Sequence, residues 1–294
     1  MIGYLAPEGF EGQLEQELTH IVARHGRLFL SEAPEKPVYW AQNVWRNLEI
    51  LPFTSISEAA SLLRARGALW AYYPIQAFRR SELIAKKLPF FSPKSLKFPS
   101  PLPKGPLGSW TLIDEKTLVA ASDCSSLFAN GEVHFQESKI PPSRAYLKLW
   151  ELFTRLEKRP GRGDKCLEIG ASPGSWTWVL QQLGSQVTAV DRAPLAPSIA
   201  QLSSVVALKK DAFSLSPADF PDINWLFSDL ICYPEKLFEW LKPWIELDIS
   251  LVCTLKFQEG SDYRIIERFA AIEGSGLIHL YHNKHELTWY RILK

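Results

Sequence analysis

The residues from Lys165 to Trp176 combine an apolar run with a glycine-bearing turn, in the order Lys-Cys-Leu-Glu-Ile-Gly-Ala-Ser-Pro-Gly-Ser-Trp. The apolar run predicts a buried strand, and the Trp-Thr-Trp-Val-Leu that follows the turn predicts the start of a helix. Glycines at a strand-to-helix turn let a ligand approach backbone that a Cβ atom would block. A second apolar run ends in Asp191, about 20 residues further on, where an acid suits a ribose diol. The stretch therefore predicts a nucleoside site.

Three acids and one lysine follow apolar runs in the same half of the chain: Asp191, Asp211, Asp229 and Lys256. In open α/β sheets, ligands bind outside the carboxyl ends of the parallel strands. These side chains are therefore expected at one edge of a sheet, beside the loop at 171–176.

Residues 139–294 alternate apolar runs with helical patterns. Strands are expected at 166–169, 187–190, 205–208, 224–228, 249–255, 277–282 and 287–292. Helices are expected near 143–157, 174–183, 195–202, 234–245 and 261–273. Such alternation predicts an α/β fold with a mostly parallel sheet. Only His-Asn-Lys-His separates the last two runs, which is too short for a crossover, so these strands are expected to form a terminal antiparallel hairpin. That ending is typical of a Rossmann-like S-adenosylmethionine-dependent methyltransferase sheet.

Residues 1–138 predict a smaller α+β domain without a nucleotide motif. Helices are expected at 14–23 and 57–66. The segment 89–106 has six prolines and cannot be a single helix, so it is expected to be a linker or an ordered surface loop. The chain is thus expected to divide into an amino-terminal accessory domain, 1–138, and a domain with the methyltransferase-like sheet, 139–294.

The charge of the chain is unevenly distributed. The formal net charge is +1 over 294 residues, yet residues 64–104 contain nine Lys or Arg and one acid, Glu82, a local balance of 9 − 1 = +8. Aromatic residues are interleaved with these charges, namely Trp70, Tyr72, Tyr73, Phe78, Phe90, Phe91 and Phe98. Cations suit phosphates and aromatic faces suit unstacked bases, so the segment is expected to contact RNA. The alternative is that the rings belong to the core and the charges form a solvated face.

Cysteines and termini indicate a cytoplasmic protein. The four cysteines are widely spaced without a CxxC pair, as expected of buried thiols in a reducing compartment. No signal peptide is expected at the start, because Glu8 and Glu11 interrupt it. No apolar run is long enough to cross a membrane. His279, His282 and His285 are not expected to bind a metal, since two of them would point to opposite faces of a strand.

Several motifs resemble those of the FtsJ-like ribose 2′-O-methyltransferases, and within them the RlmM-like group that acts on large-subunit ribosomal RNA. The segment 142–149 resembles the Pro-Ser-Arg-Ser-x-x-Lys-Leu helix of that family, and 170–177 resembles its Gly-Ala-x-Pro-Gly-Gly-Trp-Thr loop. Asp229, Lys256 and Glu286 stand where the family has an acid, a lysine and a closing glutamate. The likeness covers residues 141–294 well and is faint before them.

The resemblance implies a cofactor, a substrate and a set of site residues. It implies S-adenosyl-L-methionine as cofactor, RNA as partner, a THUMP-like amino-terminal region and no metal. It implies a Lys-Asp-Lys-Glu catalytic tetrad of Lys148, Asp229, Lys256 and Glu286. It also implies a cofactor-binding set of Ser143, Gly170, Ser172, Pro173, Gly174, Ser175, Trp176, Asp191, Asp211 and Asp229. Ser175 departs from the second loop glycine of the family, and Glu168 replaces its more common aspartate.

A ribose hydroxyl is a poor nucleophile and needs a base. Lysine in solution is normally protonated and cannot serve as one. A second lysine, the sulfonium of the cofactor and partial burial all disfavour the charged form, so Lys256 is expected to be neutral when RNA is bound and to act as general base. Asp229 is expected to orient it, while Glu286 and Lys148 position the ribose and balance charge.

Other functions compete with this hypothesis. The chain could be an RNA-binding module that has lost activity, which cofactor binding would test. It could methylate a base or a small molecule, although Ser228-Asp-Leu-Ile-Cys-Tyr lacks the Pro-Pro of amino-group methyltransferases. A nicotinamide dehydrogenase is disfavoured by the Pro-Gly loop and the terminal hairpin. Trp176 is equally well explained by packing between helix and sheet.

Overall fold

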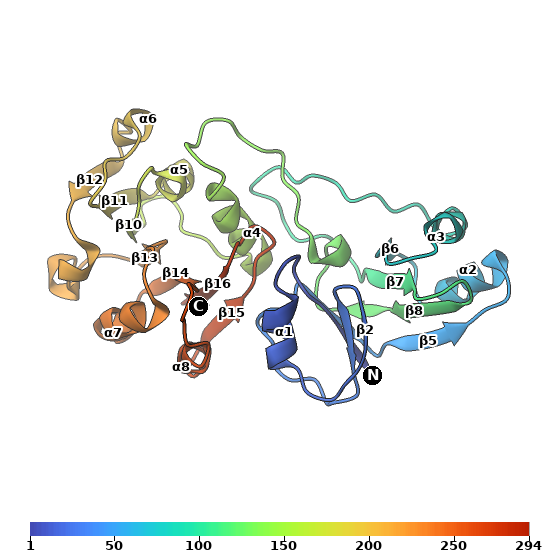
Figure 1. Ribbon diagram of the computed structural model, residues 1–294. Helices are drawn as coiled ribbons and strands as arrows, with labels where there is room; N and C mark the ends of the chain where they lie inside the picture. Colours follow the sequence, from blue (N-terminus) through green and yellow to red (C-terminus); the bar gives the residue numbers. More distant parts are fainter. Residues whose placement is uncertain (294) are drawn as a thin grey trace. The chain divides into compact units, whose positions relative to one another are not determined.

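The computed structural model describes residues 1–293, and the chain divides into two compact units (Figure 1). The first unit is Met1–Gln136 and the second begins at Glu137. Each unit has its own sheets, helices and core.

The second unit is built on a seven-stranded sheet with the order β12-β11-β10-β13-β14-β16-β15. Its strands are β10 (Lys165–Ile169), β11 (Gln186–Asp191), β12 (Val205–Lys209), β13 (Trp225–Ser228), β14 (Ser250–Lys256), β15 (Ser275–Ile278) and β16 (Glu286–Arg291). The pairs among β10 to β14 are all parallel, whereas β16 is antiparallel to both β14 and β15. The expected mixed sheet with a terminal antiparallel hairpin is confirmed.

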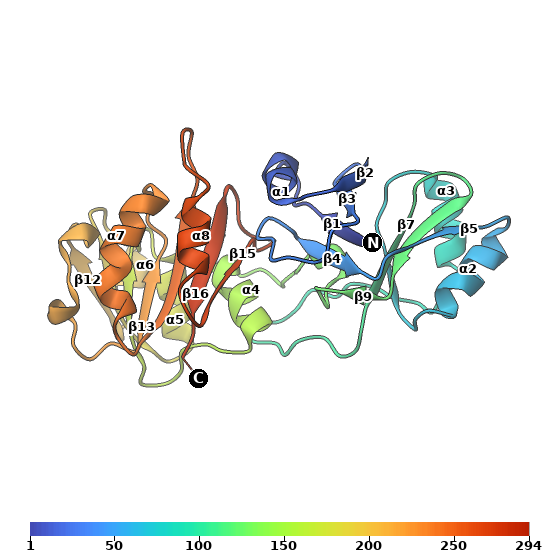
Figure 2. The same cartoon turned by 90° about the horizontal axis from the view of Figure 1, so that it is seen from below.

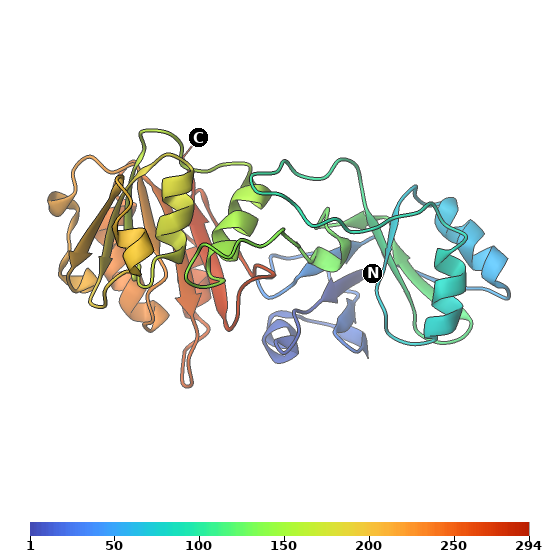
Figure 3. The ribbon, with the colours of Figure 1, turned by 90° about the horizontal axis from the view of Figure 1, so that it is seen from above.

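Helices cover both faces of this sheet, as parallel strands require. The helices are α4 (Tyr146–Leu156), α5 (Ser175–Gln182), α6 (Pro197–Ala200), α7 (Pro234–Ile245) and α8 (Ile265–Ala270). Figure 3 shows α4, α5 and α6 on one face, and Figure 2 shows α7 and α8 on the other. Short 3-10 turns, η2 (Ala212–Ser214) and η3 (Pro217–Asp219), follow β12. This layering brings the start of α4 near the carboxyl ends of the central strands.

Several elements of this unit are shorter than expected; the helix expected at 143–157, for example, is Tyr146–Leu156. The strand expected at 277–282 ends at Ile278. The backbone N–H groups of Tyr281 and His282 donate to the side chain of Glu151 on α4 instead of to a neighbouring strand. The helices expected at 195–202 and 261–273 are confined to α6 and α8. Pro197 is the first residue of α6, a position that proline commonly takes, and α8 ends at Ala270 with Ala271 as its C-cap.

The first unit contains two sheets. A five-stranded sheet has the order β2-β3-β1-β4-β9, and a four-stranded sheet has the order β5-β8-β7-β6. The strands are β1 (Ile2–Leu5), β2 (Ile21–His25), β3 (Leu28–Ser31), β4 (Asn43–Arg46), β5 (Glu49–Pro52), β6 (Trp70–Tyr72), β7 (Gly108–Leu112), β8 (Thr117–Ala121) and β9 (Asp123–Cys124). The helices are α1 (Glu11–Glu17), α2 (Ile56–Arg64) and α3 (Phe78–Ala85), with a short η1 (Ala129–Gly131).

The apolar faces of α2 and α3 close the four-stranded sheet. Ala59, Leu63 and Ile84 pack with Trp110 and Leu118 in one fully buried cluster. Ser55 caps α2 by accepting a hydrogen bond from the backbone N–H of Glu58, which explains where this helix starts. The helix expected at 57–66 is therefore confirmed, with a small shift of its limits.

The helix expected at 14–23 is wrong in its second half. α1 ends at Glu17, His20 takes a left-handed backbone with φ 52°, and Ile21 opens a strand that pairs with β3. The β-branched Ile21 and Val22 favour a strand, and pairing with β3 outweighs the helical spacing of the apolar residues.

The proline-bearing segment 89–106 is a surface loop with one bridge between Leu96 and Phe135. This confirms that it is not a helix. Within residues 1–293, no helix is both long and apolar enough to cross a membrane.

Candidate active site

Lys256 and Glu286 face each other across two neighbouring strands. They are register partners at the end of β14 and the start of β16, which run antiparallel (Figure 1). Asp229 follows β13, the strand on the other side of β14. The sheet topology alone therefore gathers three of the four predicted tetrad residues at one edge.

The fourth residue, Lys148, reaches this edge from the first turn of α4. Its Nζ atom lies 3.1 Å from Oδ1 of Asp229 and 2.8 Å from Oε1 of Glu286. The Lys148 side chain is 10% exposed and that of Glu286 is 7% exposed, so solvent screens these ion pairs little. Lys148 thus joins two carboxylates carried by different strands.

Lys256 shares the Asp229 carboxylate with Lys148. Its Nζ atom lies 2.9 Å from Oδ1 of Asp229 and donates a hydrogen bond of 2.7 Å to the backbone carbonyl of the same residue. The hydroxyl of Thr254, two residues earlier on β14, donates to the same carboxylate oxygen at 2.8 Å. The four predicted tetrad residues therefore form one connected cluster around Asp229.

The charges in this cluster stabilise one another. Burial alone would raise the pKa of Asp229, but Lys148 and Lys256 hold it below its usual value. Burial alone would lower the pKa of Lys148, but Asp229 and Glu286 raise it above its usual value. Lys148 is therefore a fixed cation and Asp229 a fixed anion at neutral pH.

The start of α4 is tied to the start of α5 by two serines. The Ser175 hydroxyl accepts from the backbone N–H of Ser143 at 3.0 Å and donates to its carbonyl at 3.0 Å, and the two hydroxyls lie 2.8 Å apart. The indole N–H of Trp176 donates to the carbonyl of Ala145 at 3.0 Å. Ser175, which departs from the glycine of the family, thus gains a role in positioning the helix that bears Lys148.

Trp176 is a packing residue in this structure. Its side chain is 2% exposed and its ring meets that of Phe227 edge to face, with centroids 6.3 Å apart. The Lys148 ammonium lies 5.8 Å from the centre of the indole ring. The indole ring therefore contacts the Lys148 ammonium of the tetrad through a cation–π interaction.

The backbone conformation and the packing of the chain both require glycine at two positions of the loop. Gly170 has φ +70°, and a Cβ atom there would lie 2.9 Å from the backbone nitrogen of Leu230. Gly174 has φ +110°, and its Cβ would lie 2.8 Å from the Ile199 side chain. The chain itself fills the space beside both glycines. That these glycines also let a ligand approach the backbone stays a prediction.

Asp191 organises the loop through its carboxylate. One oxygen accepts the backbone N–H of Ser172 at 3.0 Å and the other that of Ala193 at 2.8 Å. The Ser172 hydroxyl donates to the carbonyl of Pro194, and the carbonyl of Pro173 accepts the N–H of Ala196. The carboxylate is half-buried and keeps further lone pairs for hydroxyl donors.

Asp211 lies at the same edge as Asp191, two residues after β12, which pairs in parallel with β11. Its carboxylate accepts the N–H of Phe213 at 3.0 Å and caps η2. Two exposed or half-buried carboxylates on adjacent strand ends suit the hydroxyl and amino groups of a nucleoside. The residues present therefore fit the nucleoside part of S-adenosylmethionine.

Glu168 lies directly under the loop, inside β10. It is 1% exposed, and the Thr177 hydroxyl donates to it at 2.6 Å. Burial raises its pKa to about 8, with a small further contribution from Asp229. Glu168 is therefore mostly protonated at neutral pH and adds little negative charge to the site.

Sequence reasoning missed Glu151, which lies three residues after Lys148 on α4. Its fully buried carboxylate accepts hydrogen bonds from the backbone N–H groups of Tyr281 and His282 at 2.9 and 3.0 Å. The Nδ1 atom of the His282 ring lies 2.8 Å from the same carboxylate. Arg155 donates to it at 2.8 Å. Burial alone would raise the pKa of Glu151, but Arg155 and His282 hold it below its usual value. An acid within an otherwise apolar helix face was the available signal.

The remaining predicted features are dispersed. His279 and His285 contact the carbonyl of Lys284 and the hydroxyl of Tyr263, respectively. Within residues 1–293, no group of three or more His, Cys, Asp or Glu residues is arranged to hold a metal ion. All four cysteines are free thiols; Cys166 and Cys253 are buried, and Cys124 and Cys232 are partly exposed.

The strand order and the polar edge define the class of fold, a Rossmann-like methyltransferase sheet with a terminal antiparallel hairpin. Comparison with known proteins narrows this class. Residues 141–246 match the model of the FtsJ-like methyltransferase family. The resemblance inferred from the motifs is thereby confirmed over this segment.

The curated relatives carry the name ribosomal RNA large subunit methyltransferase M. The protein of Halorhodospira halophila is 32% identical over 51% of this chain and 46% of its own length. The protein of Idiomarina loihiensis is 28% identical over 72% of this chain and 60% of its own length. The protein of Alkalilimnicola ehrlichii is 34% identical over 51% of this chain and 45% of its own length. The chain thus spans about half the length of the curated relatives it matches.

Proposed function

We propose that the chain methylates the 2′-hydroxyl of a ribose in RNA, and that its substrate is large-subunit ribosomal RNA. The observation that carries the proposal is the cluster of two lysines and one glutamate around the Asp229 carboxylate. The names of the curated relatives support the choice of RNA.

The cofactor supplies a methyl group on a positively charged sulfur, so the acceptor oxygen needs only correct placement and removal of its proton. Asp191 and Asp211 bind the nucleoside part, and the backbone of the loop at 171–176 lies beside it. Ser143, whose hydroxyl lies 2.8 Å from that of Ser175, is proposed to contact the methionine end of the cofactor. The proposed cofactor-binding set extends to Gly170, Ser172, Pro173, Gly174 and Ser175 of the loop, whereas the buried Trp176 would act on it through packing.

Lys256 is the general base, and the geometry supports this choice over Lys148. Lys148 is held between two carboxylates, and its raised pKa keeps it protonated. Lys256 contacts one carboxylate oxygen, which it shares with Lys148 and Thr254, and a neutral backbone carbonyl. The ion pairing of Lys256 is therefore the weaker of the two.

Lys256 would take the proton of the ribose 2′-hydroxyl as the hydroxyl oxygen bonds to the transferred methyl group. S-adenosylmethionine, held by the loop and by Asp191 and Asp211, would supply that methyl group on a sulfonium, which leaves as a neutral thioether. Asp229 then stabilises the lysinium that results, and Glu286 with Lys148 holds the ribose in line.

The amino-terminal unit is proposed to serve as an accessory RNA-binding domain over residues 1–138. That this domain is THUMP-like stays a prediction from the resemblance.

Methyl transfer from labelled S-adenosylmethionine into unmodified large-subunit ribosomal RNA tests the proposal. Label in alkali-resistant dinucleotides is expected, because a 2′-O-methyl group blocks alkaline cleavage at that ribose. Label on a base would contradict it. Tight cofactor binding without methyl transfer to any ribosomal RNA would favour the alternative that the chain is an RNA-binding module that has lost its enzymatic activity.

A further inference from the structure

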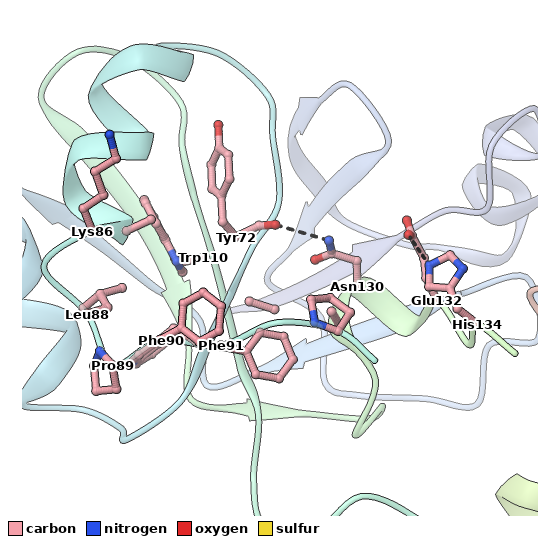
Figure 4. Close-up of a pocket in the computed structure, with 15 residues that line it drawn as sticks. Tyr72, Lys86, Leu88, Pro89, Phe90, Phe91, Trp110, Asn130, Glu132 and His134 are labelled. Atoms are coloured by element: carbon pink, nitrogen blue, oxygen red, sulfur yellow. Dashed lines mark hydrogen bonds and ion pairs between the residues drawn. The ribbon is translucent and has the colours of Figure 1, made fainter. Parts of the chain in front are cut away.

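A groove of about 420 Å³ opens in the first unit, beside the edge strand β6 (Figure 4). Its walls are β6, β7, the end of α3 and the segment that follows α3. Aromatic side chains line it, namely Trp70, Tyr72, Phe90, Phe91 and Trp110. A smaller hollow of about 280 Å³ shares Phe91, Pro93 and His134 with it and extends along residues 92–103. The two hollows therefore follow the basic, proline-bearing loop.

Phe90 is displayed to solvent rather than packed. Its side chain is 91% exposed, the highest value among the large apolar side chains of residues 1–293. Pro89 and Pro93 flank it and restrict the backbone, which lowers the entropy lost when a ligand orders this segment. A solvent-exposed aromatic ring beside an aromatic groove can stack on a planar ligand.

The flanking residues are strongly basic. Residues 83–107 contain five lysines, Lys86, Lys87, Lys94, Lys97 and Lys104, and no acid. Lys86 lines the larger hollow and Lys94 the smaller one. Within residues 1–293 none of these five lysines takes part in an ion pair, so their charges are available to an anion.

One acid also lines the groove. Glu132 lies 3.5 Å from the His134 ring, which offsets part of its charge when the ring is protonated. The lysines therefore outnumber the carboxylate along the two hollows, so the local field attracts an anionic partner. The aromatic lining favours an anionic partner that has flat bases, which is a single-stranded nucleic acid rather than an acidic peptide.

We propose that this groove is a second RNA site, which holds an unstacked base of a single-stranded segment. Phe90 stacks on the base, the half-buried Phe91 and Tyr72 form the wall behind it, and Lys86 and Lys94 contact the flanking phosphates. The inference rests on the proposed RNA substrate and adds to it a contact outside the methyltransferase unit. Every base can stack on an aromatic ring, so the site is expected to bind single-stranded RNA without sequence specificity.

Fluorescence anisotropy of the full chain with a short labelled oligouridine tests the site. Phe90→Ala is expected to weaken binding about fivefold or more, because base–aromatic stacking contributes on that scale. Phe78→Ala is the matched control, since Phe78 is also exposed, at 57%, and does not line the groove. Lys86→Ala is expected to reduce the slope of log affinity against log salt by about 1. Equal affinities of the Phe90 and Phe78 variants would overturn the site.

Two further measurements separate this site from the proposed function. Oligouridine with 5-iodouridine is expected to crosslink to the peptide that contains Phe90 and Phe91, and a crosslink confined to other peptides would overturn the site. The bases of duplex RNA are already stacked, so duplex RNA is expected to bind the wild type and Phe90→Ala with the same affinity. If Phe90→Ala weakened duplex binding as much as oligouridine binding, the proposed site would be overturned. Ribose methylation by a wild type that ignores oligouridine would reject the groove alone. Phe90-dependent binding without methyl transfer would reject the proposed function alone.

Discussion

The Nζ atom of Lys148 lies 2.8 Å from a carboxylate oxygen of Glu286, and the same ammonium holds Asp229 at 3.1 Å. One helix is thereby locked to two strands by a single buried cation. Together with Lys256, this cation holds the pKa of Asp229 below its usual value despite the burial of the carboxylate. Lys148 is thus as much a structural residue as a part of the candidate active site.

Loss of this cation should destabilise the second unit. Lys148→Met leaves two carboxylates together and is expected to lower the free energy of unfolding by about 3–5 kcal/mol, because breaking a buried pair leaves an uncompensated charge. Urea unfolding measures the loss. The double variant Lys148→Met/Glu286→Gln should recover part of it, and a loss below about 1 kcal/mol in the single variant would show that the pair is not buried in solution.

Glu151 should act through the loop that leads into Glu286. Glu151→Gln weakens the hold on the backbone N–H groups of Tyr281 and His282, so kcat for methyl transfer is expected to fall while the affinity for cofactor is retained. Glu157→Gln is the matched control, as Glu157 is exposed on the end of the same helix. Equal kcat in the two variants would contradict a positioning role.

The buried Glu168 predicts how stability depends on pH. Its folded pKa is raised to about 8, above the unfolded value of about 4.3, so the folded state binds the extra proton between these two values. The stability of the wild type should therefore fall as pH rises from 5 to about 8. Glu168→Gln cannot titrate, and it is expected to gain about 1 kcal/mol or more relative to the wild type over that range. Parallel pH profiles of the two proteins would refute this assignment.

Asp191 should control cofactor affinity. Asp191→Ala removes the acceptor for two loop N–H groups and for the predicted ribose contact, so binding of S-adenosylhomocysteine is expected to weaken about tenfold or more. Isothermal titration calorimetry provides the measurement. Asp222→Ala, at an exposed acid far along the chain from the loop, should bind as the wild type does. An Asp191 variant with unchanged affinity would remove this residue from the cofactor site.

The sequence predicts the second unit better than the first. Apolar runs in β10, β11 and β14 are buried on both faces, so local pattern and final environment agree. The residues after Leu18 carry a helical spacing that pairing with β3 overrides, and no local pattern reveals that pairing.

The candidate site divides in a similar way. Strand ends could be located from sequence, which brought Asp229, Lys256 and Glu286 to one edge. The contribution of Glu151 depends on a loop 130 residues away in the chain, so it required the structure. The packing demand on Gly170 and Gly174 was likewise hidden, because Leu230 and Ile199 approach them only in the folded state.

The central claim is that Lys256 removes the proton of a ribose hydroxyl. The most direct test is the single-turnover rate of methyl transfer from labelled S-adenosylmethionine into unmodified large-subunit ribosomal RNA, with wild type and Lys256→Ala compared at equal cofactor occupancy. We expect label in alkali-resistant dinucleotides with the wild type, and a rate for Lys256→Ala that is lower by about 10²–10⁴-fold, the usual contribution of a general base. Label that survives Lys256→Ala at a rate within about tenfold, or label that resides on a base, would contradict the account.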